Sequence, residues 1–253
     1  MAMDMAEEVT GETADDATAE AATAVMQNVI NCSADPEALA TLVTPAFVMS
    51  LGGYASIEEA AADDFFVNVP LADAELGSVT SYSDGTIGVN IQYWQTQYQV
   101  VSEKWVLVDV DGEWKIDGSR KGDPIQMDGD SAAVGVNLLE GGDGTYSIEP
   151  NRPNVTATDI LILQAINGAD NLEAHELVVV KLPDGATPEG LWDGSIADAD
   201  IEFIGVVVVP AAGDSADMTL VGLPAGVYTF VCFFPGPDGT PHAMNGMATQ
   251  FEV

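Results

Sequence analysis

The sequence predicts two domains of different class, an α+β domain followed by an all-β Greek-key sandwich. Apolar residues recur at helical spacing only in the first part of the chain, from residue 17 onward. Beyond Leu76 the pattern changes to short runs rich in Val, Ile, Tyr and Trp, separated by turn signals such as Asp111-Gly112. A turn-rich linker, residues 122–130, follows these hairpins, and helix signals do not return after it.

The α+β domain is expected at residues 17–121, after a flexible acidic lead-in at residues 1–16 that has no apolar period. Its first helix is predicted over residues 17–31. Asp35, as an N-cap before a proline, starts a second helix, and Ser56, with a glutamate three residues later, forms a capping box that starts a third.

Antiparallel strands complete this first domain and are expected to wrap around its helices. They are predicted at residues 76–82, 87–94, 97–110 and 113–118. The final segment EKWVLVDVDGEWKIDG, residues 103–118, closely resembles the last hairpin of the nuclear-transport-factor-two-like (SnoaL-like) cone fold. The resemblance implies a cone-like α+β domain.

Proteins of that cone fold include both enzymes and non-catalytic domains, and the enzymes usually place Asp, His or Tyr inside the cone. This segment contains no histidine. Asp63, Asp64 and Tyr93 could line a pocket, but a solvated helix end and an aromatic core account for them better, because no spaced acid/base pair stands out. We therefore expect a non-catalytic accessory domain and a protein that is not an enzyme.

The second domain is expected at residues 131–253, where short strands alternate with turns. The strands are predicted at residues 135–139, 145–149, 159–166, 175–182, 200–209, 216–222, 226–233 and 246–253. Short strands at this spacing, without helices between them, are typical of a Greek-key sandwich.

A candidate metal site lies in the second domain. Both histidines of the chain, His175 and His242, occur there, with Cys232 at the end of an aromatic run and Met247 shortly after the second histidine. Two imidazoles, a thiolate and a thioether form the ligand set of a blue-copper centre, whereas structural zinc is normally enclosed by Cys, His or carboxylate ligands. Met244 is a second possible thioether ligand.

The flanks of this site resemble those of the cupredoxins, the plastocyanin and azurin type of blue-copper domain. The match comprises the approach GVYTFVC at residues 226–232, the exit GMATQFEV at residues 246–253, and the four residues between His242 and Met247. In that family one histidine starts a strand, and a cysteine, a second histidine and a methionine follow on the loop between the last two strands.

The cupredoxin resemblance implies a type 1 copper ion that alternates between Cu(I) and Cu(II), held by His175, Cys232 and His242 with Met247 as the weak axial ligand. It also implies that electrons leave through an exposed edge of His242. One departure is the nine residues between Cys232 and His242, more than in plastocyanin or azurin. This insert is turn-rich and is expected to fold outward and return the histidine to the metal.

Charge restricts the partners of the chain. Forty-one acidic residues against six basic ones give a formal net charge of −35. Such a chain repels phosphate backbones and anionic membranes, so nucleic acid is excluded as a partner. The acidity serves either solubility, as in a salt-rich setting, or attraction of a basic redox partner protein.

The predicted location is outside the cytoplasm. No apolar run is long enough to span a membrane, and the N-terminus lacks the basic and apolar regions of a signal peptide. The protein is therefore either cytosolic or has had a leader removed, and composition does not decide between the two. We expect an exported protein, periplasmic or extracellular, whose leader is absent from this chain. Cys32 and Cys232 fall in different predicted domains, so no disulfide is expected between them. The sequence leaves the oligomeric state open.

Two other functions remain open from the sequence. A copper-binding or copper-delivery protein would use the long loop, together with Met1, Met3 and Met5, to capture Cu(I). A metal-free sandwich would serve adhesion or assembly.

Overall fold

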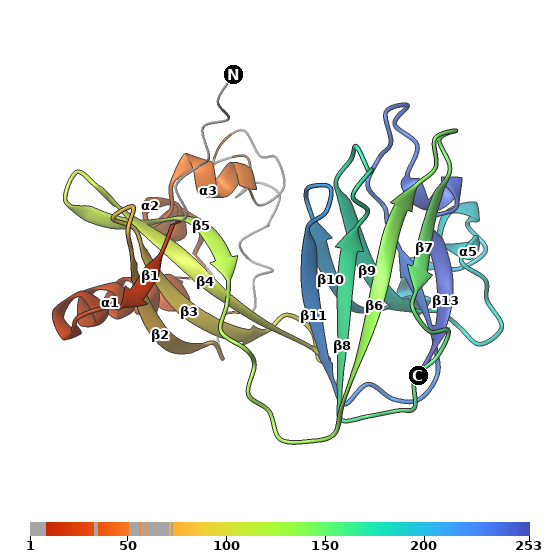
Figure 1. Ribbon diagram of the computed structural model, residues 1–253, viewed down its shortest axis with the longest axis horizontal. Coiled ribbons are helices and arrows are strands. Elements are labelled where there is room, and N and C mark those ends of the chain that lie inside the picture. The colour runs from red at the N-terminus through yellow and green to blue at the C-terminus, as the bar shows by residue number, and fades with distance from the viewer. Residues whose placement is uncertain (1–8, 33–34, 51–55, 57–58, 60–70, 72) are drawn as a thin grey trace. The chain divides into compact units, whose positions relative to one another are not determined.

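Strands greatly outnumber helices in the computed structural model, which describes residues 9–32, 35–50, 56, 59, 71 and 73–253 (Figure 1). The chain divides into two units. Unit 1 comprises Met1–Trp94 and Val101–Gln126, and unit 2 comprises Gln95–Val100 and Met127–Val253. Among the described residues, no helix has the length and apolar character needed to cross a membrane.

The first two described helices of unit 1 begin within one residue of their predicted starts, whereas the third was not predicted from the sequence. They are α1 (Asp16–Cys32), α2 (Pro36–Thr41) and α3 (Pro45–Ser50). Asp15 accepts a hydrogen bond from the backbone N–H of Thr18 at the start of α1 (3.0 Å), and Asp35 accepts one from Ala38 at the start of α2 (3.2 Å). The apolar face of α1 is buried in the core of unit 1 through Met26 and its neighbours.

The strands of unit 1 are antiparallel. They are β1 (Gly11–Thr13), β2 (Glu75–Tyr82), β3 (Ile87–Trp94), β5 (Glu113–Lys121) and most of β4 (Gln99–Val110). Asp111 and Gly112 join β4 to β5 with φ of 57° and 89°, the left-handed pair that a two-residue hairpin turn requires. The predicted Asp-Gly turn is therefore present.

Some sequence predictions lie outside the described residues. They concern Asp63 and Asp64 of the possible pocket, and the methionines at positions 1, 3 and 5. Of the predicted third helix, the structure describes only its capping residues, where the backbone N–H of Glu59 donates to Ser56 Oγ at 3.2 Å.

Unit 2 is a β-sandwich of two sheets. One sheet has the order β11-β8-β6-β7 and the other the order β10-β9-β12-β13. The strands are β6 (Ser131–Glu140), β7 (Tyr146–Pro150), β8 (Ile160–Asn167), β9 (His175–Lys181), β10 (Glu202–Val209), β11 (Ser215–Val221), β12 (Val227–Val231) and β13 (Ala248–Glu252). Strands β6 and β8 run parallel. Every strand predicted in this region is present, and the largest shift of a boundary, four residues, is at the start of β6.

Short helical turns interrupt the strands of unit 2. They are α5 (Gly190–Asp193), η2 (Asp198–Asp200) and η3 (His242–Asn245). The first two lie between β9 and β10, and η3 lies between the last two strands.

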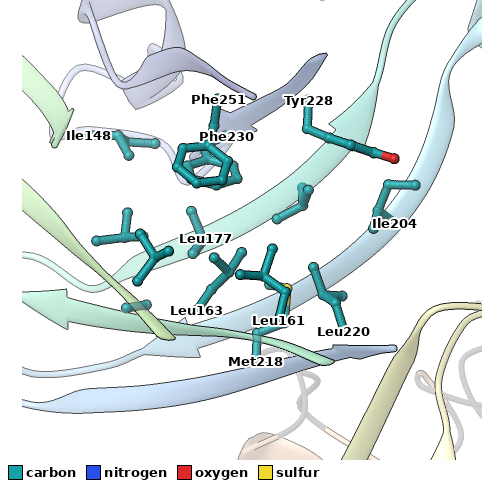
Figure 2. Packing of buried hydrophobic residues seen from close by; sticks show 14 of the residues in the cluster. Ile148, Leu161, Leu163, Leu177, Ile204, Met218, Leu220, Tyr228, Phe230 and Phe251 are labelled. Atoms are coloured by element: carbon teal, nitrogen blue, oxygen red, sulfur yellow. The ribbon is translucent and has the colours of Figure 1, made fainter. Parts of the chain in front are cut away.

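The core of unit 2 fills the space between its two sheets. Figure 2 shows Leu163 and Met218 from one sheet near Leu177 from the other. The rings of Phe230 and Phe251, on neighbouring strands, stack with centroids 5.0 Å apart. Alternating inward-facing residues of both sheets thus form one continuous core, as a sandwich requires.

A short segment before β4 and the first residues of that strand, Gln95–Val100, belong to unit 2, a placement that the sequence did not indicate. Gln99 is buried, and its side-chain amide bonds both backbone groups of Val206, donating to the carbonyl at 2.8 Å and accepting from the N–H at 2.9 Å. Strand β10 has a register shift between Phe203 and Gly205. The side chain of Gln99 thus satisfies backbone groups beside an irregular point of the ladder.

Replacing Gln99 with leucine should destabilise unit 2 by about 2–4 kcal/mol, because two partly buried backbone groups of Val206 lose their partner. The free energy of unfolding in urea measures the effect. Gln164→Leu, at an exposed position of β8, is the matched control and should change stability by no more than about 0.5 kcal/mol. Equal effects of the two substitutions would show that the Gln99 amide does not hold this part of β10.

Candidate metal centre

Adjacent strands bring the first two candidate ligands together. His175 is the first residue of β9, and Cys232 directly follows β12. These strands pair antiparallel, with Val231 opposite Val178. The start of β9 and the end of β12 therefore lie at the same end of the sheet, and Cys232 Sγ accepts a long contact from the backbone N–H of Glu176 at 3.5 Å.

The loop between Cys232 and His242 folds into a small closed hairpin. Pro235 and Pro241 form a bridge, and the backbone N–H of Gly236 donates to the carbonyl of Thr240 at 2.8 Å. His242 then donates its backbone N–H to Phe234 at 2.9 Å. The excursion thus ends beside the residues where it began and returns His242 to the cysteine.

The turn η3 and the glycine after it bring Met247 back to the same place. Gly246 has φ 108°, a left-handed conformation that ends η3 and that other residues rarely adopt. The backbone N–H of Met247 donates to the carbonyl of His242 at 3.0 Å, and its own carbonyl accepts from Cys232 at 3.1 Å. These bonds fix the backbone of the candidate ligands on this loop.

Three donor atoms converge in a fully buried space. One ligand atom each from His175, Cys232 and His242 lies within 4.8 Å of the other two, and all three residues have 0% exposure. The Nδ1 atoms of the two imidazoles are 3.2 Å apart, and Cys232 Sγ is 3.5 Å from Nδ1 of His242. Met247 is also fully buried, whereas Met244 is 50% exposed.

Two glutamates, which sequence reasoning missed, bind the outer nitrogens of the imidazoles. Glu140 Oε1 lies 3.1 Å from Nε2 of His175, and Glu173 Oε2 lies 2.6 Å from Nε2 of His242. Glu173 stands two positions before His175 in the sequence, but among 41 acidic residues nothing distinguishes it or Glu140 as a histidine partner.

These carboxylates determine which nitrogen of each ring carries the proton. An ionised carboxylate only accepts hydrogen bonds, so each Nε2 must be the donor. In a ring whose only proton is on Nε2, Nδ1 presents a lone pair, and the two Nδ1 atoms lie 3.2 Å apart. Two such lone pairs facing each other beside a sulfur atom repel unless a proton or a metal cation lies between them. The donor set therefore fits a metal ion that accepts nitrogen and sulfur ligands.

The ionisation of the site also suits a metal. Burial lowers the pKa of His175, with a further contribution from His242 and opposition from Glu140, so its imidazole tends to remain neutral. Burial raises the pKa of the Cys232 thiol to about 11. A metal must therefore displace the thiol proton on binding. Neither Cys232 nor the half-buried Cys32 forms a disulfide.

Tyr146 covers His242, so the predicted exposed edge of this histidine is wrong. The two rings stack with centroids 4.1 Å apart at 17°, and the tyrosine hydroxyl donates to Glu173 Oε2 at 3.2 Å. With Nε2 bound to Glu173, His242 has no contact with solvent. The covering groups come from strand β7 and from the loop before β9, which the local sequence around His242 does not reveal.

Comparisons with known proteins give structural matches only. No family model matches the sequence. No curated protein matches it either. Among solved structures, auracyanin A, a "blue" copper protein from Chloroflexus aurantiacus, matches at 14% identity over 49% of this chain and 99% of its own, with a TM-score of 0.33. Reduced auracyanin from Roseiflexus castenholzii matches at 17% identity over 48% of this chain and 95% of its own, with a TM-score of 0.33. Rusticyanin from Thiobacillus ferrooxidans matches at 14% identity over 49% of this chain and 77% of its own, with a TM-score of 0.33.

Proposed function

We propose that this protein is a type 1 copper protein that carries single electrons. The observation that supports it is the enclosed group of three donors, in which Nδ1 of His175, Nδ1 of His242 and the sulfur of Cys232 face one another without access to solvent. Met247, buried and joined by backbone hydrogen bonds to both Cys232 and His242, is the axial ligand in this proposal. The exposure of Met244 argues against that role for it.

Copper bound by a thiolate and two imidazoles would supply a one-electron redox couple. The contribution of the chain is to hold these donors in one arrangement in both oxidation states. His175 and Cys232 are attached to paired strands, and the backbone bonds of η3 hold His242. Limited movement of the ligands keeps the reorganisation energy low, and burial excludes water.

The enclosed site favours a carrier over a copper-delivery protein. Delivery requires the ion to leave quickly, whereas here all three donor residues are fully buried and Tyr146 stacks on His242. The contacts that close the hairpin between Cys232 and His242 also hold in place the long loop that a delivery protein would use to capture Cu(I).

The remaining parts of the proposal concern the rest of the chain. Unit 1, with its helices and antiparallel strands, is proposed to be a non-catalytic cone-like accessory domain of the nuclear-transport-factor-two-like type. The net charge of −35 supports a basic protein as redox partner. An exported location, periplasmic or extracellular, completes the proposal.

Addition of Cu(II) to the purified, metal-free protein should produce an intense visible thiolate-to-copper absorption band at one equivalent of metal. Voltammetry of the same sample should give a reversible one-electron couple. Cys232→Ser should abolish the band, because the hydroxyl cannot replace the thiolate. Cys32→Ser is the matched control and should leave both measurements unchanged.

Two results would contradict the carrier. Colourless, tight binding of Cu(I) without a visible Cu(II) band would indicate copper delivery. If elemental analysis finds no copper in wild type or in Cys232→Ser after loading, the sandwich is metal-free and serves another purpose.

The two methionines near the site should respond differently to substitution by leucine. Met247→Leu should keep copper and the visible band but shift the reduction potential, because the axial ligand tunes it. Its effect on stability should be below about 1.5 kcal/mol, since the side-chain volumes are similar. Met244→Leu should leave the reduction potential unchanged. A shift of the potential in Met244→Leu but not in Met247→Leu would show that Met244 is the axial ligand.

A further inference from the structure

We propose that Glu140 and Glu173 are positioning residues that hold both imidazoles with Nδ1 toward Cys232, and that their negative charges bias a bound copper ion toward its divalent state. The second half of this statement rests on the proposed function. The first half concerns the protein with or without metal.

Glu140 lies at the end of β6 and joins the loop before β9 to that strand. Its carboxylate accepts the backbone N–H of Leu172 at 2.9 Å and that of Glu173 at 2.8 Å, besides the Nε2–H of His175 at 3.1 Å. These three donors fix the orientation of the carboxylate. The ring of His175 is therefore held by a carboxylate that backbone hydrogen bonds also hold.

Glu173 holds His242 in a different manner, through side chains. Its Oε2 accepts from Nε2–H of His242 at 2.6 Å and from the hydroxyl of Tyr146 at 3.2 Å. Because Tyr146 also stacks on the imidazole, two contacts restrict rotation of the ring about its χ angles.

Two buried asparagines anchor the loop that bears Glu173. The side chain of Asn167 donates to the carbonyl of Glu173 at 3.0 Å, and Asn171 donates to Leu138 at 2.8 Å. The amide of Asn171 also donates to Asn167 Oδ1 at 2.6 Å. The position of the Glu173 backbone is thus set by the sandwich rather than by the metal.

The negative charges of the two carboxylates would favour the divalent state of a bound copper ion. A divalent ion with one thiolate leaves one positive charge, and a monovalent ion leaves none. Two carboxylates, each one imidazole away from the ion, stabilise the more positive state through the charge-assisted Nε2–H bonds. Low polarity around the buried rings strengthens this effect. The carboxylates therefore lower the reduction potential relative to neutral acceptors in the same positions.

Nuclear magnetic resonance of the ring nitrogens tests the positioning without copper. The chain has only two histidines, so selective ¹⁵N labelling of histidine gives signals from these two rings alone. In the metal-free protein both Nε2 atoms should be protonated. Glu173→Leu should release the ring of His242, which then populates the tautomer with the proton on Nδ1. An unprotonated Nε2 on His242 in wild type, or an unchanged tautomer in Glu173→Leu, would overturn the positioning role.

Glutamine variants test the charge, because glutamine keeps an acceptor for Nε2–H but removes the negative charge. Glu173→Gln and Glu140→Gln should each raise the ratio of Cu(I) to Cu(II) affinity about tenfold, at the lower end of the effect of substituting groups behind a ligand. A tenfold change corresponds to an increase of about 59 mV in the reduction potential. The wild-type tautomer should persist in both variants.

Glu149→Gln is the matched control, since Glu149 is exposed on β7 and its carboxylate binds Ser147 rather than an imidazole. The proposed bias in oxidation state is overturned if the reduction potential shifts no more in Glu173→Gln and Glu140→Gln than in this control. Glu140 also binds backbone groups, so Glu140→Gln can fail to fold. In that case the potential of Glu173→Gln alone decides whether the charge bias exists. If wild type binds no copper, the proposed function and the bias both fail, while the ring tautomers still decide the positioning role.

Discussion

The candidate metal centre depends on one electrostatic constraint, the approach of the two imidazole Nδ1 atoms to 3.2 Å of each other inside a fully buried space. Carboxylates on the outer nitrogens direct both lone pairs inward, so neither ring can relieve the repulsion by changing its tautomer without losing a charge-assisted bond. The loop hydrogen bonds and the paired strands keep the rings from moving apart. A site built in this way has the donors to hold a cation, which is the basis of the proposed function.

The sequence predicted the parts of this arrangement that local residue type determines. Turn signals and apolar runs located all eight strands of unit 2, because each strand depends mainly on its own alternation and its own turns. The convergence of His175, Cys232 and His242 could be proposed because both histidines, a cysteine and a methionine occurred near strand ends. The four residues between His242 and Met247, a gap that matches the cupredoxins, supported this hypothesis further.

Other features depend on contacts between residues far apart in the chain, and the sequence did not reveal them. Glu140 and Tyr146 reach the site from β6 and β7, which carry no local signal of a metal centre. The stack of Tyr146 on His242 explains why the expected exposed edge is absent. Gln99 bonds a strand more than a hundred positions away, and its local pattern was simply that of a strand. Such pairings follow from the assembled fold, where burial selects polar partners after the strands have met.

Because the loop between Cys232 and His242 forms a closed hairpin, its length does not affect the positions of the candidate ligands. Its ends are held by the bridge between Pro235 and Pro241 and by the backbone bond from His242 to Phe234, so its tip does not determine where the histidine lies. Closing a longer loop costs little additional entropy once its base is fixed. The tip around Asp238 and Gly239 can therefore vary in length and composition, and it offers a place for new surface features, including segments that recognise a partner, beside an unchanged candidate metal site.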